Sequence, residues 1–263
     1  MTTKSIVTTD VWLKLRATTS ARIALGRAGG SLPTQEWLDF KAAHAEARDA
    51  VHNEFAAEQL AAEIRKLGAE VLVLDSAAPD RLTFLQRPDL GRQLDERSRY
   101  LLQELPNQGP APALAIVISD GLSALAVERH VPPLLAAVLP WLTSEGWRIG
   151  PVVIARYGRV ALQDEVGNLL GAQLALTLIG ERPGLGSPDS LGAYLVYAPR
   201  AGNTDAQRNC VSNIRPAGLS IYEAANTIYY LLTESRRKKL SGTQLKDQRV
   251  LANEAARRAI SGD

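Results

Sequence analysis

Three short, uninterrupted apolar runs constrain the fold of this chain more than any other feature. They are Leu114–Ile118 (LAIVI), Pro151–Ala155 (PVVIA) and Gln173–Ile179 (QLALTLI). Such runs, bounded by turn residues, are typical of strands that are buried on both faces. Helical patterns over Pro132–Gly146 and Leu162–Leu170 lie between them. Strands that alternate with helices through short connections predict a largely parallel sheet with helices on both sides.

The C-terminal part of the chain adds to this pattern. Two shorter strand candidates are Ala193–Tyr197 and Val211–Ile214, and an amphipathic helix is expected over Ser220–Leu232. Ser220 and Glu223 have the S-x-x-E spacing of a capping box, in which the serine hydroxyl and the carboxylate each accept a backbone N–H. This predicts that the helix begins at Ser220.

In the first half of the chain, apolar residues have the spacing of helices instead of forming continuous runs. Between Thr34 and about Arg65, apolar residues recur three and four apart on one helical face, and they include Trp37, Phe40, His44, Ala47, Val51 and Phe55. The segment Pro106–Pro112 holds three prolines and a glycine and predicts a linker. We therefore expect a mainly helical N-terminal region over residues 1–106, followed by an α/β domain over residues 113–263.

Composition narrows the classes of function. Lys and Arg number 30 against 28 Asp and Glu, so charge alone favours neither nucleic acid nor an anionic membrane as partner. A single cysteine excludes an internal disulfide and a cysteine-rich zinc site, which suits a reducing cytoplasm. No run has the length and apolarity of a membrane span or of a signal peptide. A cytoplasmic protein is expected.

Three loops follow the predicted strands, and ligands of parallel sheets bind beyond the carboxyl ends of strands. They are Ser119–Ser123 (SDGLS), Arg156–Val160 (RYGRV) and Gly180–Ser187 (GERPGLGS). The third loop is neither a G-x-G-x-x-G dinucleotide fingerprint nor a P-loop. Backbone groups with Glu181, Arg156, Arg159 and Arg182 suit a large ligand that carries many amides and a phosphate.

Independent catalysis has little support in the residues, and we predict no catalytic residue and no metal site. The three histidines, His44, His52 and His130, lack the spacing of metal ligands. Ser119 and Asp120 with His130 suggest a hydrolase triad, but the G-x-S-x-G elbow is missing. Cys210 has no base beside it in the sequence and is expected to be a small buried residue at the start of a strand.

Several segments together resemble the small (light, or β) subunit of ethanolamine ammonia-lyase. They are Gly26–Thr34, Phe84–Leu94, Val117–Val127, Arg156–Ala172, Ile179–Arg200 and Arg208–Gly218. The resemblance implies a Rossmann-like domain that holds adenosylcobalamin at the interface with a large TIM-barrel subunit in a hetero-oligomer. That enzyme converts ethanolamine to acetaldehyde and ammonia by a radical mechanism, and its cofactor supplies the radical chemistry.

The resemblance also implies which residues bind the cofactor. Carried over position by position, the family's cobalamin contacts of this subunit fall on Val160, Glu181 and Cys210. The chain has no D-x-H-x-x-G, the signature of corrinoid domains that place a histidine on cobalt. The family is found in the cytoplasm, in some members within an ethanolamine-utilisation microcompartment, although this chain lacks the long N-terminal extension of enteric members. A stand-alone corrinoid- or nucleotide-binding module and a hydrolase that uses Ser119 or Cys210 are the alternatives.

Overall fold

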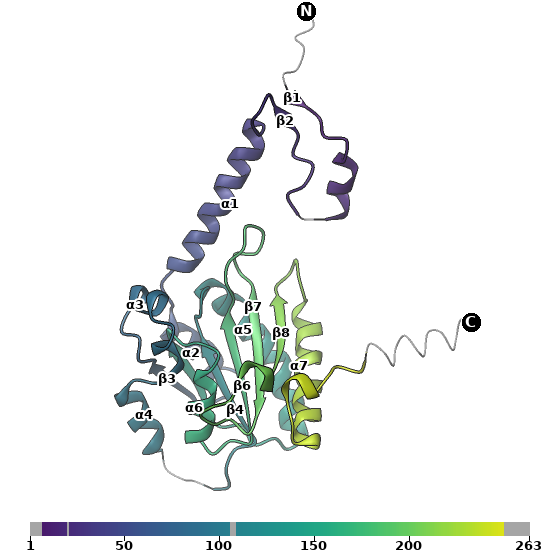
Figure 1. The fold of residues 1–263 in the computed structure, drawn as a ribbon. Helices are drawn as coiled ribbons and strands as arrows, with labels where there is room; N and C mark the ends of the chain where they lie inside the picture. The colour runs from purple at the N-terminus through teal and green to yellow at the C-terminus, as the bar shows by residue number, and fades with distance from the viewer. Residues whose placement is uncertain (1–6, 20, 106–108, 250–263) are drawn as a thin grey trace, which may run out of the picture.

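The structure, a computed structural model, describes residues 7–19, 21–105 and 109–249 (Figure 1). Its body is built on a six-stranded sheet with the strands β3 (Val71–Asp75), β4 (Leu114–Ser119), β5 (Val152–Arg156), β6 (Leu174–Gly180), β7 (Leu191–Tyr197) and β8 (Arg208–Ile214). Their spatial order is β3-β5-β4-β6-β7-β8. The pairs from β3 to β6 are parallel, and β7 and β8 are antiparallel to their neighbours. The expected α/β fold with a largely parallel sheet is confirmed, with an antiparallel edge.

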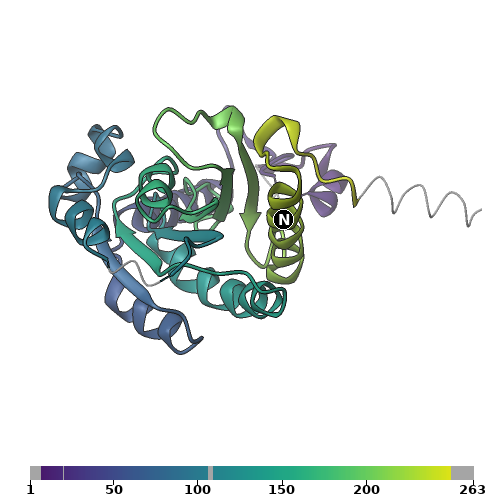
Figure 2. The ribbon, with the colours of Figure 1, turned by 90° about the horizontal axis from the view of Figure 1, so that it is seen from below.

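Helices cover both faces of this sheet (Figure 2). In chain order they are α1 (Thr34–His52), α2 (Ala57–Arg65), α3 (Arg81–Gln86), α4 (Glu96–Gln103), α5 (Ala124–Ser144), α6 (Leu162–Leu169) and α7 (Ile221–Lys238). The larger apolar core lies between one face of the sheet and α2, α5 and α7. A smaller core lies between the other face and α4 and α6. Every residue of β4 and of β6 is buried, as their continuous apolar sequence predicts.

The sheet also takes a strand from the segment expected to be mainly helical. Residues Val71–Asp75 form β3, which pairs in parallel with β5 at the edge of the sheet. The helices α2, α3 and α4 from the same segment lie around this edge (Figure 1). The sheet therefore crosses the predicted division between residues 106 and 113.

Helix α5 begins eight residues earlier than its sequence predicts. Its N-cap is Ser123, whose hydroxyl accepts the backbone N–H of Ala126, and three prolines lie inside the helix. Prolines at 132 and 133 each remove a helical hydrogen bond, and for that reason they resemble a helix start. The helix continues through them because its buried face packs in the larger core, with Val127, Leu134 and Leu135 at most 1% exposed.

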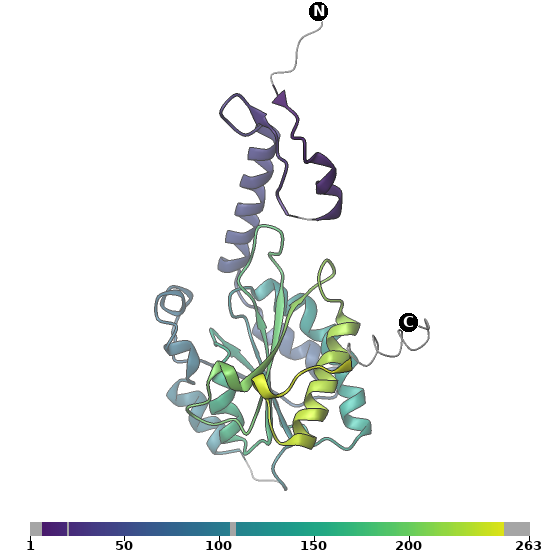
Figure 3. The same cartoon turned by 45° about the vertical axis from the view of Figure 1, so that its right-hand side comes forward.

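The region between Thr34 and Arg65 is two helices, because the chain breaks at residues 53–56 between α1 and α2. The predicted apolar face of α1 is not a core face, since only Ala43 and Ala50 are buried and Trp37 is 45% exposed. Helix α1 projects from the body together with the small sheet of β1 (Val7–Thr8) and β2 (Arg27–Ala28) (Figures 1 and 3). No residue of the described ranges buries that face.

Helix α7 begins where the capping box predicts. The hydroxyl of Ser220 accepts the backbone N–H of Glu223, and the Glu223 carboxylate accepts the N–H of Ser220. The helix runs six residues past the predicted end, to Lys238, and its buried side chains Ala224, Ile228 and Leu232 pack in the larger core. Among the helices of the described ranges, none is long and apolar enough to cross a membrane.

Candidate functional site

The three loops predicted to form a site meet at the carboxyl edge of the parallel strands. The backbone N–H of Leu122 donates to the carbonyl of Gly180 over 2.9 Å, which ties the loop after β4 to the end of β6. The N–H of Gly158 donates to Ser119 Oγ over 2.8 Å, which ties the same loop to the one after β5. A Cβ at Gly121 would lie 2.5 Å from the Gly180 carbonyl, so this close contact requires glycine.

Asp120 is the buried centre of this edge. Its Oδ1 accepts the backbone N–H of Tyr157 over 2.7 Å, and its Oδ2 pairs with Arg81 over 2.8 Å. Burial raises the pKa of Asp120 to about 6, although Arg81 and the Tyr157 N–H favour the ionised carboxylate. Arg81 also donates to the carbonyl of Val51 in α1, so one guanidinium links the projecting helix to the loops. Asp120 thus holds the RYGRV loop in place.

A hollow of about 750 Å³ lies beside this loop, on the face of the sheet that carries α6. Its lining includes Val160, Tyr194, Cys210, Arg92, Arg159 and Arg208. Helix α6 packs on β4 and β6. Beyond α6, Tyr194 of β7 and Arg208 and Cys210 of β8 line the hollow from the same face of the sheet. The hollow therefore extends from the carboxyl edge along the antiparallel strands, beyond the place where the rule for parallel sheets puts a ligand.

Two of the three predicted cofactor contacts lie in this hollow. Val160 lines it from the loop after β5, and Cys210 lines it from β8. Cys210 is exposed and lies inside the strand, so the expectation of a buried residue at a strand start was wrong. It is paired across the strands with Tyr194, and the thiol and the phenol form a hydrogen bond. Burial raises the pKa of the Tyr194 phenol and of the Cys210 thiol, so both groups stay protonated near neutral pH.

Glu181 lies next to the hollow and is not part of its lining. Its carboxylate accepts from Ser190 Oγ over 2.5 Å, from Ser212 Oγ over 2.6 Å and from the backbone N–H of Asn213 over 3.1 Å. A Cβ at Gly192 would stand 3.0 Å from Glu181 Oε1, so the glycine makes room for the carboxylate. The structure thus fixes the orientation of Glu181 from β7 and β8. Oε1 accepts a single bond and retains an acceptor position.

The other end of the hollow is polar and charged. Arg208 is buried, and its guanidinium bonds Asp164 of α6, the exposed Asp205 and the carbonyl of Asn203. Burial raises the pKa of Asp164 to about 6, while Arg208 acts in the opposite direction. Arg208 belongs to a segment that carries the resemblance, but its partners come from α6 and from the 203–205 turn. A sequence pattern holds no signal for such pairs.

Of the charged loop residues considered from the sequence, Arg159 alone lines the hollow. Arg156 is paired instead with Asp75 and Glu58, at 3.1 and 3.6 Å, on the side of β3. Arg92 also lines the hollow. It lies outside the three predicted loops, in a short turn before α4. The segment Phe84–Leu94 contains it, so the resemblance was the one available signal.

The histidine of the suggested triad is not beside the serine. His130 is buried on α5, and its Nε2 lies 3.6 Å from Asp189. Ser119 Oγ donates to Asp120 and accepts from Gly158 instead. His44, predicted on the apolar face of the first long helix, is exposed on α1 and stacks on Phe40. Within the described ranges, no group of three or more His, Cys, Asp or Glu residues could hold a metal ion.

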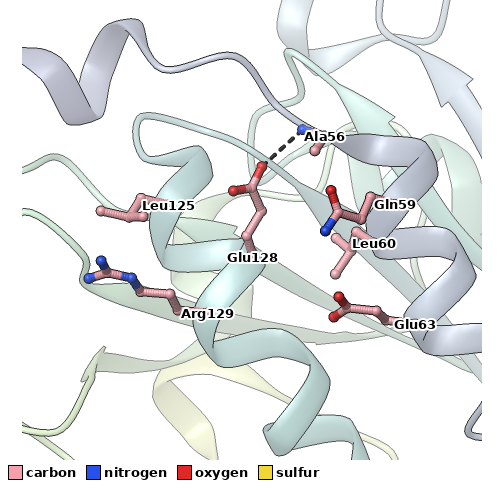
Figure 4. A pocket seen from close by; sticks show the side chains of 7 residues that line it. All are labelled: Ala56, Gln59, Leu60, Glu63, Leu125, Glu128 and Arg129. Atoms are coloured by element: carbon pink, nitrogen blue, oxygen red, sulfur yellow. Dashed lines mark hydrogen bonds between the residues drawn. The ribbon is translucent and has the colours of Figure 1, made fainter.

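A smaller hollow of about 160 Å³ lies between α2 and α5 (Figure 4). Its side chains Gln59 and Glu63 come from α2, and Glu128 and Arg129 from α5. Glu128 Oε1 accepts the backbone N–H of Ala56 over 2.9 Å, at the N-terminus of α2, which has no side-chain cap of its own. The contact anchors the break between α1 and α2, so we assign this hollow a structural role.

The fold and the larger hollow define the class. This is an α/β protein with a candidate ligand site, an open hollow lined by hydroxyl, thiol, carboxylate and guanidinium groups beside the loop after β5. A site open on one side needs another surface to enclose a ligand fully.

Comparison with known proteins gives the family. Residues 9–246 match the ethanolamine ammonia-lyase light chain family (EutC). The chain is 53% identical over 253 residues to the ethanolamine ammonia-lyase small subunit of Azotobacter vinelandii, covering 96% of this chain and 94% of that one. It is 56% identical over 238 residues to that of Pseudomonas putida KT2440, covering 90% and 88%. The chain belongs to the ethanolamine ammonia-lyase light-chain family, as its motifs predict.

Proposed function

We propose that this chain is the small subunit of an adenosylcobalamin-dependent ethanolamine ammonia-lyase and that its hollow forms one wall of the cofactor site. The observation that carries the proposal is the meeting of Val160 and Cys210 in one hollow. These residues are 50 positions apart in the sequence, and the family resemblance by itself implies that both contact the cofactor. Family membership supports the subunit assignment.

The residues present fit a corrinoid. Three polar atoms on the lining are buried and have no hydrogen-bond partner: Arg159 Nε, Arg208 Nε and Asn203 Oδ1. Unpaired buried polar atoms are rare in proteins, and their gathering at one hollow favours a polar ligand there. The rim of a corrin ring carries amides, which can both donate and accept.

Within that site the side chains of this chain bind and orient. Val160 offers apolar contact, and the protonated Cys210 and Tyr194 offer weak donors. The open acceptor position of Glu181 Oε1 suits an amide N–H, as a charge-assisted hydrogen bond. When bound, the cofactor would supply the radical chemistry of the reaction. The chain itself contributes no acid, base or nucleophile to that reaction.

A large subunit completes the proposal. The hollow is open, and a radical reaction requires a site closed to water, so a second surface must cover it. We assign to this partner, a TIM barrel, the ethanolamine-binding residues and the release of acetaldehyde and ammonia. The two subunits would form a hetero-oligomer in the cytoplasm, and in a host with shell proteins they would lie within an ethanolamine-utilisation microcompartment.

Reconstitution tests the proposal. The chain and the large subunit are purified separately, and acetaldehyde release from ethanolamine is measured with adenosylcobalamin. We expect no activity from either subunit alone and activity from the mixture. Acetaldehyde release by this chain alone would favour an independent lyase, and labelling of Ser119 or Cys210 by a serine- or thiol-reactive probe would favour the hydrolase. Micromolar corrinoid binding without the large subunit, together with no restored activity, would favour the stand-alone binding module.

A further inference from the structure

Two arginines at the hollow have no carboxylate partner among the residues that the structure describes. Of the charged side chains that line the hollow, Arg208 is paired with Asp164 and Asp205. Neither Arg92 nor Arg159 forms an ion pair with any residue that the structure describes. The chain as a whole is nearly neutral, with a net charge of +2. The hollow therefore holds a local excess of positive charge.

Arg159 is held in place and is not a solvated surface arginine. Its guanidinium lies over the Phe84 ring, 3.9 Å from the ring centroid, and donates to the Phe84 carbonyl over 3.1 Å. Its backbone N–H donates to the Gly91 carbonyl over 2.6 Å. A Cβ at Gly91 would stand 2.8 Å from Arg159 Cγ, so the glycine makes room for the stem. These contacts hold one face of the Arg159 guanidinium and one of its nitrogens, and they leave its other N–H groups unpaired.

This arrangement has an electrostatic cost. Burial lowers the pKa of Arg159, and the charges of Arg81, Arg92 and Arg182 lower it further. Only Asp120 acts in the opposite direction, and its carboxylate is already paired with Arg81. A preorganised cation that is partly desolvated and surrounded by other cations is stabilised when an anion binds. The planar fork of arginine matches the oxygens of a phosphate or a carboxylate.

We propose that Arg159, assisted by Arg92, binds the phosphodiester of the cofactor's nucleotide loop. This inference rests on the proposed function. Among the groups of adenosylcobalamin, the phosphodiester is the anionic one, and the amides of the corrin rim carry no charge. The nucleotide arm would then lie beside the RYGRV loop, with the corrin rim toward Val160, Tyr194 and Cys210. Arg159 is in this account a binding residue that selects corrinoids that retain the nucleotide.

The experiment compares two ligands on the complex of this chain with its large subunit. The dissociation constants of adenosylcobalamin and of adenosylcobinamide, which lacks the nucleotide loop, are measured by absorbance titration. For Arg159→Gln we expect the Kd of adenosylcobalamin to rise about tenfold or more, and that of adenosylcobinamide to stay within about twofold. The difference in adenosylcobalamin affinity between Arg159→Gln and the wild type should shrink as the salt concentration rises, because screening weakens the arginine–phosphate pair in the wild type.

Matched variants keep the result interpretable. Arg156→Gln, in the same loop but paired with Asp75 and Glu58, should change neither constant. Arg92→Gln removes an exposed side chain that makes no hydrogen bond with any described residue, so it tests the charge even if Arg159→Gln does not fold. It should selectively weaken adenosylcobalamin, by a smaller factor.

Three results would overturn the inference. An equal loss for both ligands would make Arg159 a structural residue of the loop. No loss for either ligand, with weakened subunit association instead, would make a carboxylate of the large subunit its partner. If Arg92→Gln leaves the adenosylcobalamin constant unchanged, the hollow does not attract an anion there. A wild-type complex that binds neither corrinoid would contradict the proposed function itself.

Discussion

Replacing Glu181 with alanine tests how β7 and β8 hold the side chain assigned to the cofactor. In the structure its carboxylate joins three donors, the hydroxyls of Ser190 and Ser212 and the backbone N–H of Asn213. Glu181→Ala removes all three contacts. It also removes the acceptor that we assign to a corrin amide. The variant should therefore lower both the stability of the folded chain and its affinity for the cofactor.

The expected loss of stability follows from exposure. A hydrogen bond to a charged group in a protein contributes about 1.5–3 kcal/mol when its partners are buried. Here Ser190 is buried, but Ser212 and Asn213 are exposed and can bond water instead. We therefore assign about 1 kcal/mol to the Ser190 bond and about 0.5 kcal/mol to each of the others, about 2 kcal/mol in total. For a chain of this size, that lowers Tm by about 4–8 °C.

Thermal unfolding and corrinoid titration measure the two effects separately. Ser212→Ala is the matched control, because it removes one exposed donor and leaves the carboxylate, and it should lower Tm by about 1–2 °C. In the complex, Glu181→Ala should weaken adenosylcobalamin binding by about 1–3 kcal/mol. A Tm within 1 °C of the wild type would refute the reasoning about the three donors. An unchanged affinity would show that the carboxylate does not bind the cofactor.

Three further predictions rest on single contacts. Gly192→Ala places a Cβ 3.0 Å from the Glu181 carboxylate and should lower the free energy of unfolding, measured by denaturant titration, by about 1 kcal/mol. An unchanged free energy of unfolding would mean that the backbone of β7 shifts to accommodate the added methyl group. The pKa of Asp164 is raised to about 6 by burial, so the native state binds more protons than the unfolded state between pH 4 and 6, and ionisation costs stability as pH rises. The stability of Asp164→Asn relative to wild type should therefore rise by up to about 3 kcal/mol over that range, and a flat difference would contradict the shift. Glu128→Ala removes the acceptor of the Ala56 N–H and should cost about 1 kcal/mol, whereas Glu128→Gln, which keeps an acceptor oxygen, should cost less.

Sequence predicted the buried sheet well because its signal is local. The runs at 114–118, 151–155 and 173–179 lie within one residue of β4, β5 and β6, since a strand buried on both faces leaves no polar alternation to misread. The errors arose where a local pattern depends on distant partners. The prolines at 132 and 133 suggested a helix start, although core packing carries α5 through them. The apolar face predicted for α1 exists as a pattern, but its only buried residues in the structure are Ala43 and Ala50.

The site was predicted in part, for the same reason. Val160 and Cys210 came from the resemblance, and the hollow that joins them is lined in part from β7 and β8, which no periodicity indicates. The partners of Glu181 are 9, 31 and 32 residues away and reach it through the register of three strands. Arg159 was noticed as a charged loop residue, but its isolation from carboxylates becomes visible only in three dimensions.

The most direct test of the central claim is hydrogen exchange of the complex with and without adenosylcobalamin. If this chain forms one wall of the cofactor site, the cofactor should slow backbone exchange in residues 156–160 and in β8, while α5 and the smaller hollow at α2 remain unchanged. Slowed exchange confined to the large subunit, with no change in these two segments, would contradict the account.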